Sequence, residues 1–370
     1  MARVSDFISA TVADGVGHVT LDRPQAINAL SYEMIRELAA VFDAWRTDTE
    51  VGLVVLDGAG DRGFCAGGDI RELYGYVTAD EHETAHQFFR TEYRLDAAIA
   101  RFPKPVVAIM DGITMGGGIG LSGHAAIRVV TERSRLAMPE TRIGFTPDVG
   151  GTWLLGKAPG ELGVHLALNS RVMDASDALY AGFADAFVPS ERLPHLVQAL
   201  HERADPGSPA EIVMLFDETP DPSPLALARG WIDACYSAPT VAEIVARLRA
   251  VADGRWDDAG LAESVNLDPE ASAHAAAAAA ELETLSPTSL TIALEAVRRA
   301  RTLPRLEDAL EQEFRAVAWF LEQPDLREGI RAQVIDKDRS PKWTPPKIAD
   351  VPAGLAARAL DDRRYAPVFG

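Results

Sequence analysis

Residues 105–151 decide the fold, and they read PVVAIMDGITMGGGIGLSGHAAIRVVTERSRLAMPETRIGFTPDVGG. An apolar run at 106–110 predicts a buried strand, which Asp111 and Gly112 end. The glycine-rich turn at 116–120 then leads into a predicted helix that extends to about residue 123. Glycines at a strand-to-helix turn allow backbone N–H groups to approach a ligand closely, and the helix adds the positive end of its dipole. The pattern indicates an anion or oxyanion site, and tight turns without a ligand are the alternative explanation.

Two acidic residues follow in the same stretch, and both lie in sequence that predicts turns. Glu140 belongs to Met-Pro-Glu, and Asp148 belongs to Pro-Asp-Val-Gly-Gly. Functional side chains are concentrated in loops that a rigid scaffold positions. Glu140 and Asp148 are therefore candidate catalytic carboxylates, and solvated turn residues are the alternative.

An earlier copy of this pattern precedes the stretch. Residues 54–58 (VVLDG) parallel residues 108–112 (AIMDG), and each copy continues into a glycine-rich turn and a helix. We interpret them as two copies of one supersecondary unit that stack side by side. Stacking would bring the turn at Gly68 close to the turn at Gly117. Two backbone N–H groups would then point at one oxygen, which is the geometry of an oxyanion hole.

The rest of the chain predicts an α/β protein that becomes helical toward its C-terminal end. The turn signal Ala13-Asp14-Gly15 predicts a hairpin of strands 7–12 and 16–21. Further predicted elements are strands at 51–56 and 127–130 and helices at 31–46, 79–101, 175–182, 190–203, 269–285 and 286–301. Proline-rich segments at 205–209 and 219–224 indicate a boundary. We therefore expect a first domain at 1–205 and a helical region at 206–370.

Composition and charge exclude several classes of protein. The net charge is −19, and no cluster of Lys and Arg forms the basic patch that a nucleic-acid binder or an anionic membrane surface requires. The two cysteines, Cys65 and Cys235, have no metal-binding or redox spacing. The N-terminus lacks an apolar signal core, and no apolar run approaches the ~20 residues of a membrane span. We expect a cytoplasmic protein without nucleic-acid or membrane partners.

Three motifs match known sites only in part. His82 to His86 fit H-E-x-x-H, but they open a polar helix and no third zinc ligand follows. Residues 118–123 fit G-x-G-x-x-G, but the preceding strand has already ended at residue 110. Residues 151–157 fit a phosphate loop, but Ala158 replaces the required Ser or Thr. We expect neither a metal nor a nucleotide cofactor.

Several motifs resemble those of the crotonase superfamily, the enoyl-CoA hydratases and isomerases. They are DRP at 22–24 with NAL at 28–30, FCAGGDI at 64–70 and GITMGGG at 112–118. Other segments resemble one branch of that superfamily, the 3-hydroxyisobutyryl-CoA hydrolases. They are AMPET at 137–141, FTPDVGG at 145–151, SPTS at 286–289 and IDKDRSPKW at 335–343. The similarity extends from about residue 16 to residue 343.

The resemblance implies a crotonase-like spiral of stacked ββα units that binds acyl-CoA, followed by a helical C-terminal region. It implies that the N–H groups of Gly68 and Gly117 hold the thioester oxygen. It further implies that Glu140 acts on the acyl carbonyl or on water, and that Asp148 lies beside the 3-hydroxyl of the substrate or the water. Glu92 would line the acyl pocket. The implied CoA contacts are Ala66, Asp69 and Ile70 near the adenine, and Arg23 and Ala26 near the CoA chain.

This chain differs from the hydratases at one position that matters for the reaction. Hydratases carry a second catalytic glutamate three residues beyond the oxyanion glycine, where this chain has Gly120. The resemblance therefore implies hydrolysis of a short, branched 3-hydroxyacyl-CoA, as in valine breakdown, with CoA as part of the substrate and no separate cofactor. The alternatives are a hydratase or isomerase of the same fold and an acyl-CoA-binding protein without activity. A homo-oligomer is also implied, because the superfamily tends to form trimers.

Overall fold

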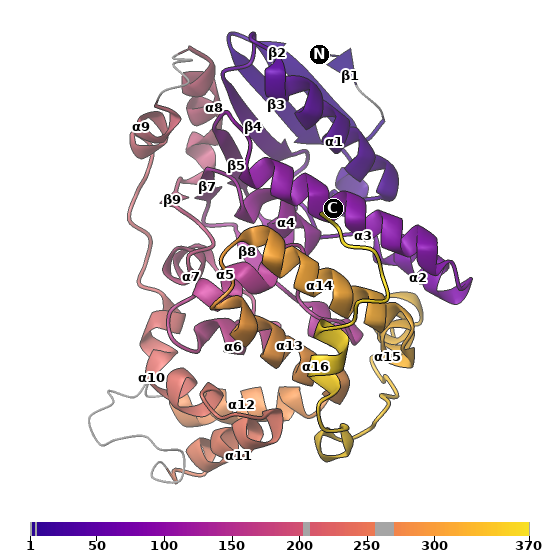
Figure 1. Ribbon diagram of the computed structural model, residues 1–370. Helices are drawn as coiled ribbons and strands as arrows, with labels where there is room; N and C mark the ends of the chain where they lie inside the picture. Colours follow the sequence, from indigo (N-terminus) through magenta and orange to yellow (C-terminus); the bar gives the residue numbers. More distant parts are fainter. Residues whose placement is uncertain (1, 4–5, 203–207, 256–269, 370) are drawn as a thin grey trace. The chain divides into compact units, whose positions relative to one another are not determined.

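The computed structural model describes residues 2–3, 6–202, 208–255 and 270–369. The chain, whose helices and strands are labelled in Figure 1, divides into two compact units that interleave along the sequence. The sheet unit comprises residues 1–69, 87–137 and 172–221, and the helical unit comprises residues 70–86, 138–171 and 222–370. This division differs from the expected domains at 1–205 and 206–370, because residues 70–86 and 138–171 pack with the C-terminal helices. The expected boundary residue 205 itself lies outside the described residues.

A seven-stranded sheet organises the sheet unit, in the order β1-β2-β3-β4-β5-β7-β9. β2 and β3 form the predicted antiparallel hairpin, and the pairs β3–β4, β4–β5, β5–β7 and β7–β9 are parallel. β4 and β5 pair directly, which confirms that the two copies of the repeated pattern stack. The strands are β1 (Ala2–Arg3), β2 (Ile8–Ala13), β3 (Val16–Leu21), β4 (Leu53–Gly58), β5 (Val106–Met110), β7 (Ile127–Val130) and β9 (Ala186–Phe187), with β6 (Ile113–Met115) and β8 (Arg135–Ala137) forming a separate parallel pair.

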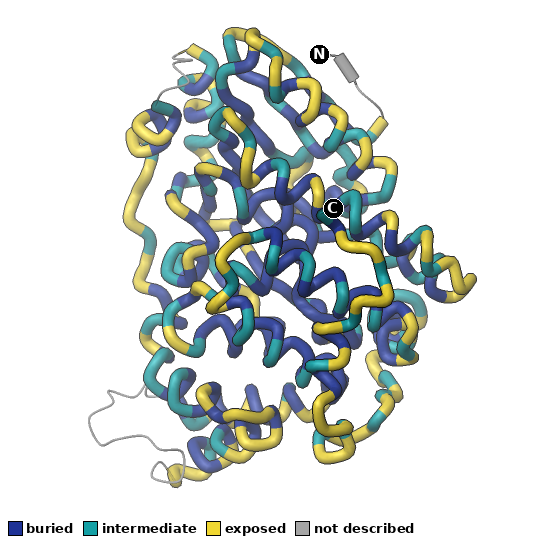
Figure 2. The backbone as a smooth tube through the Cα atoms, in the orientation of Figure 1, coloured by how far each residue is buried: buried dark blue, intermediate teal, exposed yellow. Residues whose placement is uncertain are grey.

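Alternate residues of these strands form one continuous apolar core, because successive side chains in a strand point to opposite faces of the sheet. Val55 of β4, Val107 and Ile109 of β5 and Val129 of β7 belong to the same hydrophobic core as the buried Leu196 of α8. The strands are buried along most of their length (Figure 2). The helices of this unit are α1 (Tyr32–Thr47), α4 (Gly117–Gly123), α7 (Ala175–Ala181), α8 (Leu193–Glu202), α9 (Pro209–Met214), most of α3 (His82–Ala100) and the 3-10 turns η1 (Pro24–Ala26) and η3 (Ser190–Arg192).

One helix was not predicted. The helix expected at 79–101 is present as α3, which begins at His82, but a separate helix, α2 (Ile70–Thr78), precedes it. Asp80 between them adopts a left-handed backbone conformation with φ of 55°. An α-helix cannot continue through that conformation. α2 therefore ends before Asp80, and α3 begins after it.

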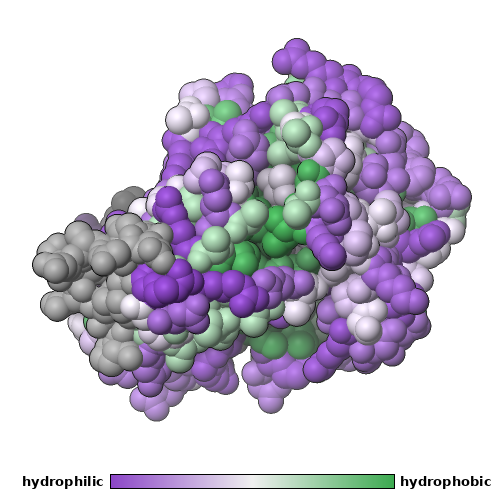
Figure 3. All heavy atoms as spheres, turned by 90° about the horizontal axis from the view of Figure 1, so that it is seen from below, coloured by the Kyte–Doolittle hydropathy of each residue, from purple (hydrophilic) through white to green (hydrophobic). Residues whose placement is uncertain are grey.

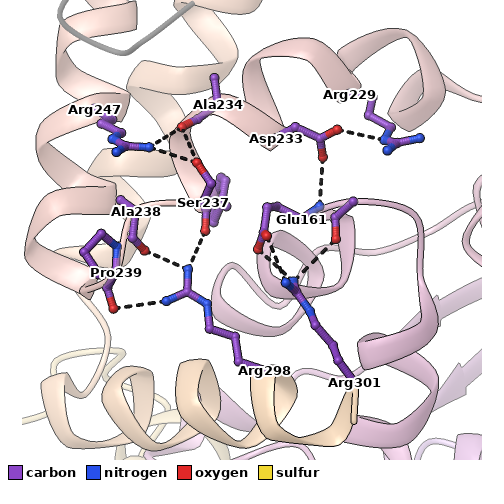
Figure 4. Close-up of polar contacts among 12 residues, drawn as sticks. Glu161, Arg229, Asp233, Ala234, Ser237, Ala238, Pro239, Arg247, Arg298 and Arg301 are labelled. Carbon is purple, nitrogen blue, oxygen red and sulfur yellow. Dashed lines mark hydrogen bonds and ion pairs between the residues drawn. The ribbon is translucent and has the colours of Figure 1, made fainter.

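The helical unit confirms the prediction that the chain is mostly helical after residue 151. Side chains of arginine residues tie its loops to its helices: Arg298 of α13 donates to the carbonyls of Ala238 and Pro239, and Arg301 pairs with Glu161 (Figure 4). Its elements are α2, η2 (Glu140–Ile143), α5 (Gly151–Lys157), α6 (Leu162–Leu168), α10 (Pro224–Tyr236), α11 (Val241–Ala252), α12 (Ala271–Leu282), α13 (Pro287–Ala300), α14 (Leu306–Leu321), α15 (Pro324–Ile330), η5 (Arg331–Ile335), η6 (Ile348–Asp350) and α16 (Leu355–Leu360).

A groove hollows the surface of the helical unit. A groove of about 460 Å³ in the helical unit is lined by residues 239–242, 351–357 and neighbouring side chains of α13, and it contains none of the predicted site residues. On the face seen from below, hydrophobic side chains lie in hollows between hydrophilic ones (Figure 3). Within the described residues, no helix has both the length and the apolar character that a bilayer crossing requires.

Candidate active site

The two glycine turns of the sheet unit lie next to each other, as the repeat predicted. Cys65 and Thr114 form a parallel bridge, with Cys65 N donating to Ile113 O (3.1 Å) and Met115 N donating to Cys65 O (2.9 Å). A Cβ placed on Gly117 would lie 3.2 Å from the backbone nitrogen of Gly68. Within the described residues, neither the Gly68 nor the Gly117 N–H donates to a protein acceptor. Two backbone N–H groups without a protein acceptor therefore lie close together.

Glycine is required at this place because the backbones approach closely. A Cβ on Gly118 would lie 2.6 Å from the carbonyl oxygen of Cys65, which is backbone and cannot give way. Gly67 has a φ of +99°, a conformation that side chains disfavour. Leu30 N donates to the Gly67 carbonyl (2.8 Å), and Asp69 N donates to the Leu30 carbonyl (2.7 Å). The first turn is thus fixed on both sides by backbone hydrogen bonds.

Glu92 lies beside this donor pair. It comes from α3, its side chain is buried, and its Oε1 would be 2.5 Å from a Cβ on Gly117. Burial raises the pKa of the Cys65 thiol to about 12, and the charge of Glu92 adds to the rise. Cys65 is therefore protonated at neutral pH and is no nucleophile. The structure brings Glu92, Gly68 and Gly117 together.

Four of the five residues expected to hold CoA lie in the sheet unit, and Ile70 is the exception. Arg23 donates to Asp69 (2.8 Å) and to the carbonyl of Ala29 (2.9 Å). Ala66 N donates to Ile27 O (2.9 Å), which ties the two loops together, and Ala26 ends η1 in the same loop as Arg23. Ile70 is the first residue of α2 and belongs to the helical unit. A phosphate on Arg23 would have to compete with Asp69 for the guanidinium group.

Asn28 organises these loops, and the sequence assigned it no role. It is buried, and its Nδ2 lies within hydrogen-bond distance of the carbonyls of Ala59 (3.0 Å), Gly63 (3.2 Å) and Phe64 (3.0 Å). Its Oδ1 accepts from Arg23 N (2.9 Å). Its place in the NAL motif was the one feature of the sequence that could have indicated this role. The three carbonyls lie more than thirty residues away along the chain, so no local pattern connects them to Asn28.

The two candidate carboxylates lie on one loop of the helical unit, and both are buried, with 7% of Glu140 and 5% of Asp148 exposed. Glu140 opens η2, and its carbonyl accepts from Phe145 N (3.1 Å). The next residue, Thr141, is fixed through its hydroxyl to that of Ser170 (2.7 Å). Burial rules out the alternative of solvated turn residues for both acids.

Glu313 is a residue of this region that the sequence did not reveal. It lies on α14, and its carboxylate accepts from Gly150 N (2.7 Å) and Thr152 N (2.9 Å), immediately after Asp148. Burial raises its pKa to about 8, against the lowering effect of its hydrogen bonds, and the charge of Asp148 adds to the rise. In the sequence it is one acid on an amphipathic helix, so no local pattern distinguished it.

The histidine pair of the H-E-x-x-H match is part of a packed helix end. The ring of His86 is buried and lies 4.7 Å from the ring of Tyr365 and 6.0 Å from that of Phe314. His82 lies 3.8 Å from Asp80. Over the part of the chain that the structure describes, no group of three His, Cys, Asp or Glu side chains could hold a metal ion.

The fold and this arrangement belong to a known class of proteins. The family model described as "Enoyl-CoA hydratase/isomerase" matches residues 16–360. The chain therefore belongs to the enoyl-CoA hydratase/isomerase family, whose fold the sequence resemblance predicted.

Individual relatives and solved structures show which members of the family this chain is similar to. The chain is 37% identical over 345 residues to the 3-hydroxyisobutyryl-CoA hydrolase of Gallus gallus, covering 91% of this chain and 84% of the relative. It is 37% identical over 343 residues to the enzyme of that name from Homo sapiens, with 90% and 83% covered. A solved structure of a carnitinyl-CoA dehydratase from Mycobacterium thermoresistibile is 42% identical, with a TM-score of 0.85 and 96% of both chains covered. One of an enoyl-CoA hydratase from Rhodobacter sphaeroides is 40% identical, with a TM-score of 0.84 and 96% and 97% covered.

The comparisons correct one expectation. We predicted a cytoplasmic protein, but the relatives named as 3-hydroxyisobutyryl-CoA hydrolases are mitochondrial proteins. The prediction was wrong because it depended on unpaired cysteines and on the lack of an apolar signal core. Those features do not distinguish the cytosol from the mitochondrial interior.

Proposed function

We propose that this chain is a thioesterase that releases CoA from a short, branched 3-hydroxyacyl-CoA, with 3-hydroxyisobutyryl-CoA as its substrate. The observation that carries the proposal is the pair of available N–H donors of Gly68 and Gly117, with Gly117 beside the buried Glu92. The names of the relatives support the choice of thioester and acyl group. Gly120 supports hydrolysis over hydration, because the second glutamate of the hydratases is replaced there.

The donor pair suits the chemistry of a thioester. When a nucleophile attacks the carbonyl carbon, negative charge develops on its oxygen, and preorganised N–H groups stabilise that charge. Each such donor contributes about 2.7–4 kcal/mol to lowering the barrier. In the proposed reaction, Gly68 and Gly117 donate to the thioester oxygen throughout the step.

Glu140 supplies the carboxylate of the reaction. As a general base it takes a proton from water while the water oxygen bonds to the carbonyl carbon. The tetrahedral intermediate then collapses, the C–S bond breaks, and the proton passes to the sulfur, which gives the free acid and CoA thiol. As a nucleophile Glu140 forms a mixed anhydride with release of CoA, and water then cleaves the anhydride. Both routes use the same residue and give the same products.

Asp148 and Glu92 define the acyl group in this proposal. A buried carboxylate accepts a hydrogen bond from the 3-hydroxyl of the substrate, and it is left without that bond when the hydroxyl is missing. Asp148 is assigned this role, and Glu92 is assigned to the acyl pocket.

CoA is the remaining part of the substrate. The proposal places Arg23 and Ala26 near the CoA chain and Ala66, Asp69 and Ile70 near the adenine. No cofactor beyond the substrate is required for thioester hydrolysis by a carboxylate and two N–H donors. A homo-oligomer is part of the proposal, and light scattering on the purified protein tests it.

One assay separates the proposal from its rivals. Free thiol and double-bond absorbance are followed in parallel with hydroxyacyl-CoA and enoyl-CoA substrates. The proposal predicts thiol release from 3-hydroxyisobutyryl-CoA and no change in double-bond absorbance with enoyl-CoA. A hydratase would change the absorbance without releasing thiol, and a binding protein would do neither. Absence of thiol release from every short hydroxyacyl-CoA would refute the hydrolase.

A further inference from the structure

The turn that carries Asp148 has a backbone that its own sequence does not favour. Val149 is β-branched and buried, yet it has a φ of 53°, and Gly150 follows with a φ of 77°. A left-handed conformation is a genuine outlier for a β-branched residue, and it persists only where the surroundings impose it. Gly151 N donates to Asp148 O (2.6 Å), which closes the turn. Something outside the turn must hold it in this shape.

Glu313 makes the contacts that hold it. Its Oε2 accepts from Gly150 N (2.7 Å), its Oε1 accepts from Thr152 N (2.9 Å), and the Thr152 hydroxyl also donates to Oε1. Gly150 precedes α5 and Thr152 lies in its first turn, where N–H groups have no acceptor within the helix. One side-chain carboxyl group therefore accepts from the donors on both sides of Gly151. Glu313 is 1% exposed, so water does not compete for these bonds.

We propose that Glu313 is a positioning residue for Asp148, which it places for the reaction by fixing the backbone of residues 148–152. The inference depends on the proposed function, in which Asp148 accepts from the substrate hydroxyl or orients water. Glu313 itself touches no substrate in this account. The competing explanation is that Glu313 only braces α5 against α14 and affects folding alone.

A double-mutant cycle distinguishes these two explanations. Glu313→Gln keeps the size of the side chain but turns an NH₂ group toward a backbone N–H. We expect kcat for thiol release to fall ~30-fold, with KM changed less than ~3-fold, because a misplacement of about 1 Å can reduce the rate ~100-fold. The preference for 3-hydroxyisobutyryl-CoA over isobutyryl-CoA should fall with it. In an Asp148→Asn background, the same Glu313→Gln change should alter kcat less than ~2-fold, since residues that act through one another are not additive.

Two further variants keep the test decisive. Thr152→Val removes only the hydroxyl contact, and it replaces Glu313→Gln in the test if that variant does not fold. We expect it to lower kcat ~3–5-fold. This loss should be absent in the Asp148→Asn background. Glu161→Gln is the matched control. Glu161 is another largely buried carboxylate of the helical unit, and it pairs with Arg301 at the start of α6 (Figure 4). This control should lower the melting temperature and leave kcat and substrate preference unchanged.

The outcomes are distinguishable. Equal loss of kcat from Glu313→Gln in both backgrounds, or a lowered melting temperature with unchanged kcat and preference, would overturn the positioning role while leaving the proposed function intact. Full activity and unchanged preference in Asp148→Asn alone would refute the assignment of Asp148, and the positioning role would fall with it. A loss that is large with Asp148 and absent without it supports the inference.

Discussion

The glycine turns of the sheet unit and the Asp148 turn of the helical unit are held by opposite means. Residues 63–68 and 112–118 are fixed mainly by backbone hydrogen bonds between neighbouring segments, such as Cys65 N to Ile113 O (3.1 Å). Residues 148–152 are closed by the hydrogen bond from Gly151 N to Asp148 O (2.6 Å), and they are anchored by the side chain of Glu313, which lies 163 residues beyond Gly150. The first arrangement is a property of the repeated fold, and the second depends on a single buried acid.

This difference has a consequence for how each region tolerates change. A backbone ladder loses little when one exposed side chain is replaced, but it cannot accept a Cβ where two backbones touch. A side-chain anchor fails when its one residue is changed. Substitutions that add an atom should therefore damage the sheet unit, and substitutions that remove a carboxylate should damage the helical unit.

Apart from Glu140→Gln, Gly117→Ala should lower kcat more than any other substitution. The new Cβ would lie 2.5 Å from Glu92 Oε1 and 3.2 Å from Gly68 N, and would therefore crowd the donor pair. We expect kcat to fall ~10²–10³-fold, the scale of losing one oxyanion donor. Gly75→Ala in α2 is the control, because nothing lies within 4 Å of its Cβ, and it should leave kcat unchanged. Activity of Gly117→Ala within ~3-fold of the parent would contradict the donor assignment.

Asp148→Asn should lower kcat by at least the ~30-fold expected of Glu313→Gln, and it should also act on selectivity. We expect the preference for 3-hydroxyisobutyryl-CoA over isobutyryl-CoA to fall ~10-fold, because a hydrogen bond to a charged group becomes one to a neutral amide. The ratio of kcat/KM for the two esters is the measurement. An unchanged ratio with a lower overall rate would show that Asp148 serves the water or Glu140 instead.

The sequence predicted the strands and turns of the sheet unit far better than it predicted the side chains that hold the loops in place. The strands, the hairpin and the adjacency of the turns at Gly68 and Gly117 follow from local patterns that the structure confirms. The carboxylates Glu140 and Asp148 could be singled out because they stand next to turn residues. Asn28 and Glu313 could not, because their roles come from partners that only the folded chain brings close. The interleaving of the two units was missed for the same reason.

Asn28 tests whether the sheet unit also depends on a side chain. Asn28→Ala removes the shared donor of three carbonyls and places Ala at a φ of 53°. We expect the free energy of unfolding in urea to fall by about 2–4 kcal/mol. Asn28→Gly removes the hydrogen bonds but relieves the backbone, so it separates the two causes. A loss below about 0.5 kcal/mol in both variants would show that the backbone ladder alone holds the turns.

The smallest expected effect is a loss of stability in the helical unit at acidic pH. Burial lowers the pKa of His165 to about 3, below its ordinary 6.5. Below pH 6.5 the unfolded chain binds a proton that the folded chain does not, so stability falls as the pH decreases toward 3. The loss from this group is about 1.4 kcal/mol at pH 5.5. Urea unfolding at pH 7.5 and 5.5 should show a smaller decrease for His165→Phe than for the parent; equal decreases would contradict the buried neutral state.

Glu140→Gln tests the central claim most directly. The change keeps size and hydrogen bonding but removes the negative charge and the basicity of the one residue assigned to act on the thioester. Thiol release from 3-hydroxyisobutyryl-CoA and the melting temperature are measured on the same preparation. The account predicts a fall in kcat of at least ~100-fold, the scale of losing a positioned acid or base, with the melting temperature and CoA binding little changed. Near-normal turnover by the folded variant, or a parent that releases no thiol, would contradict it.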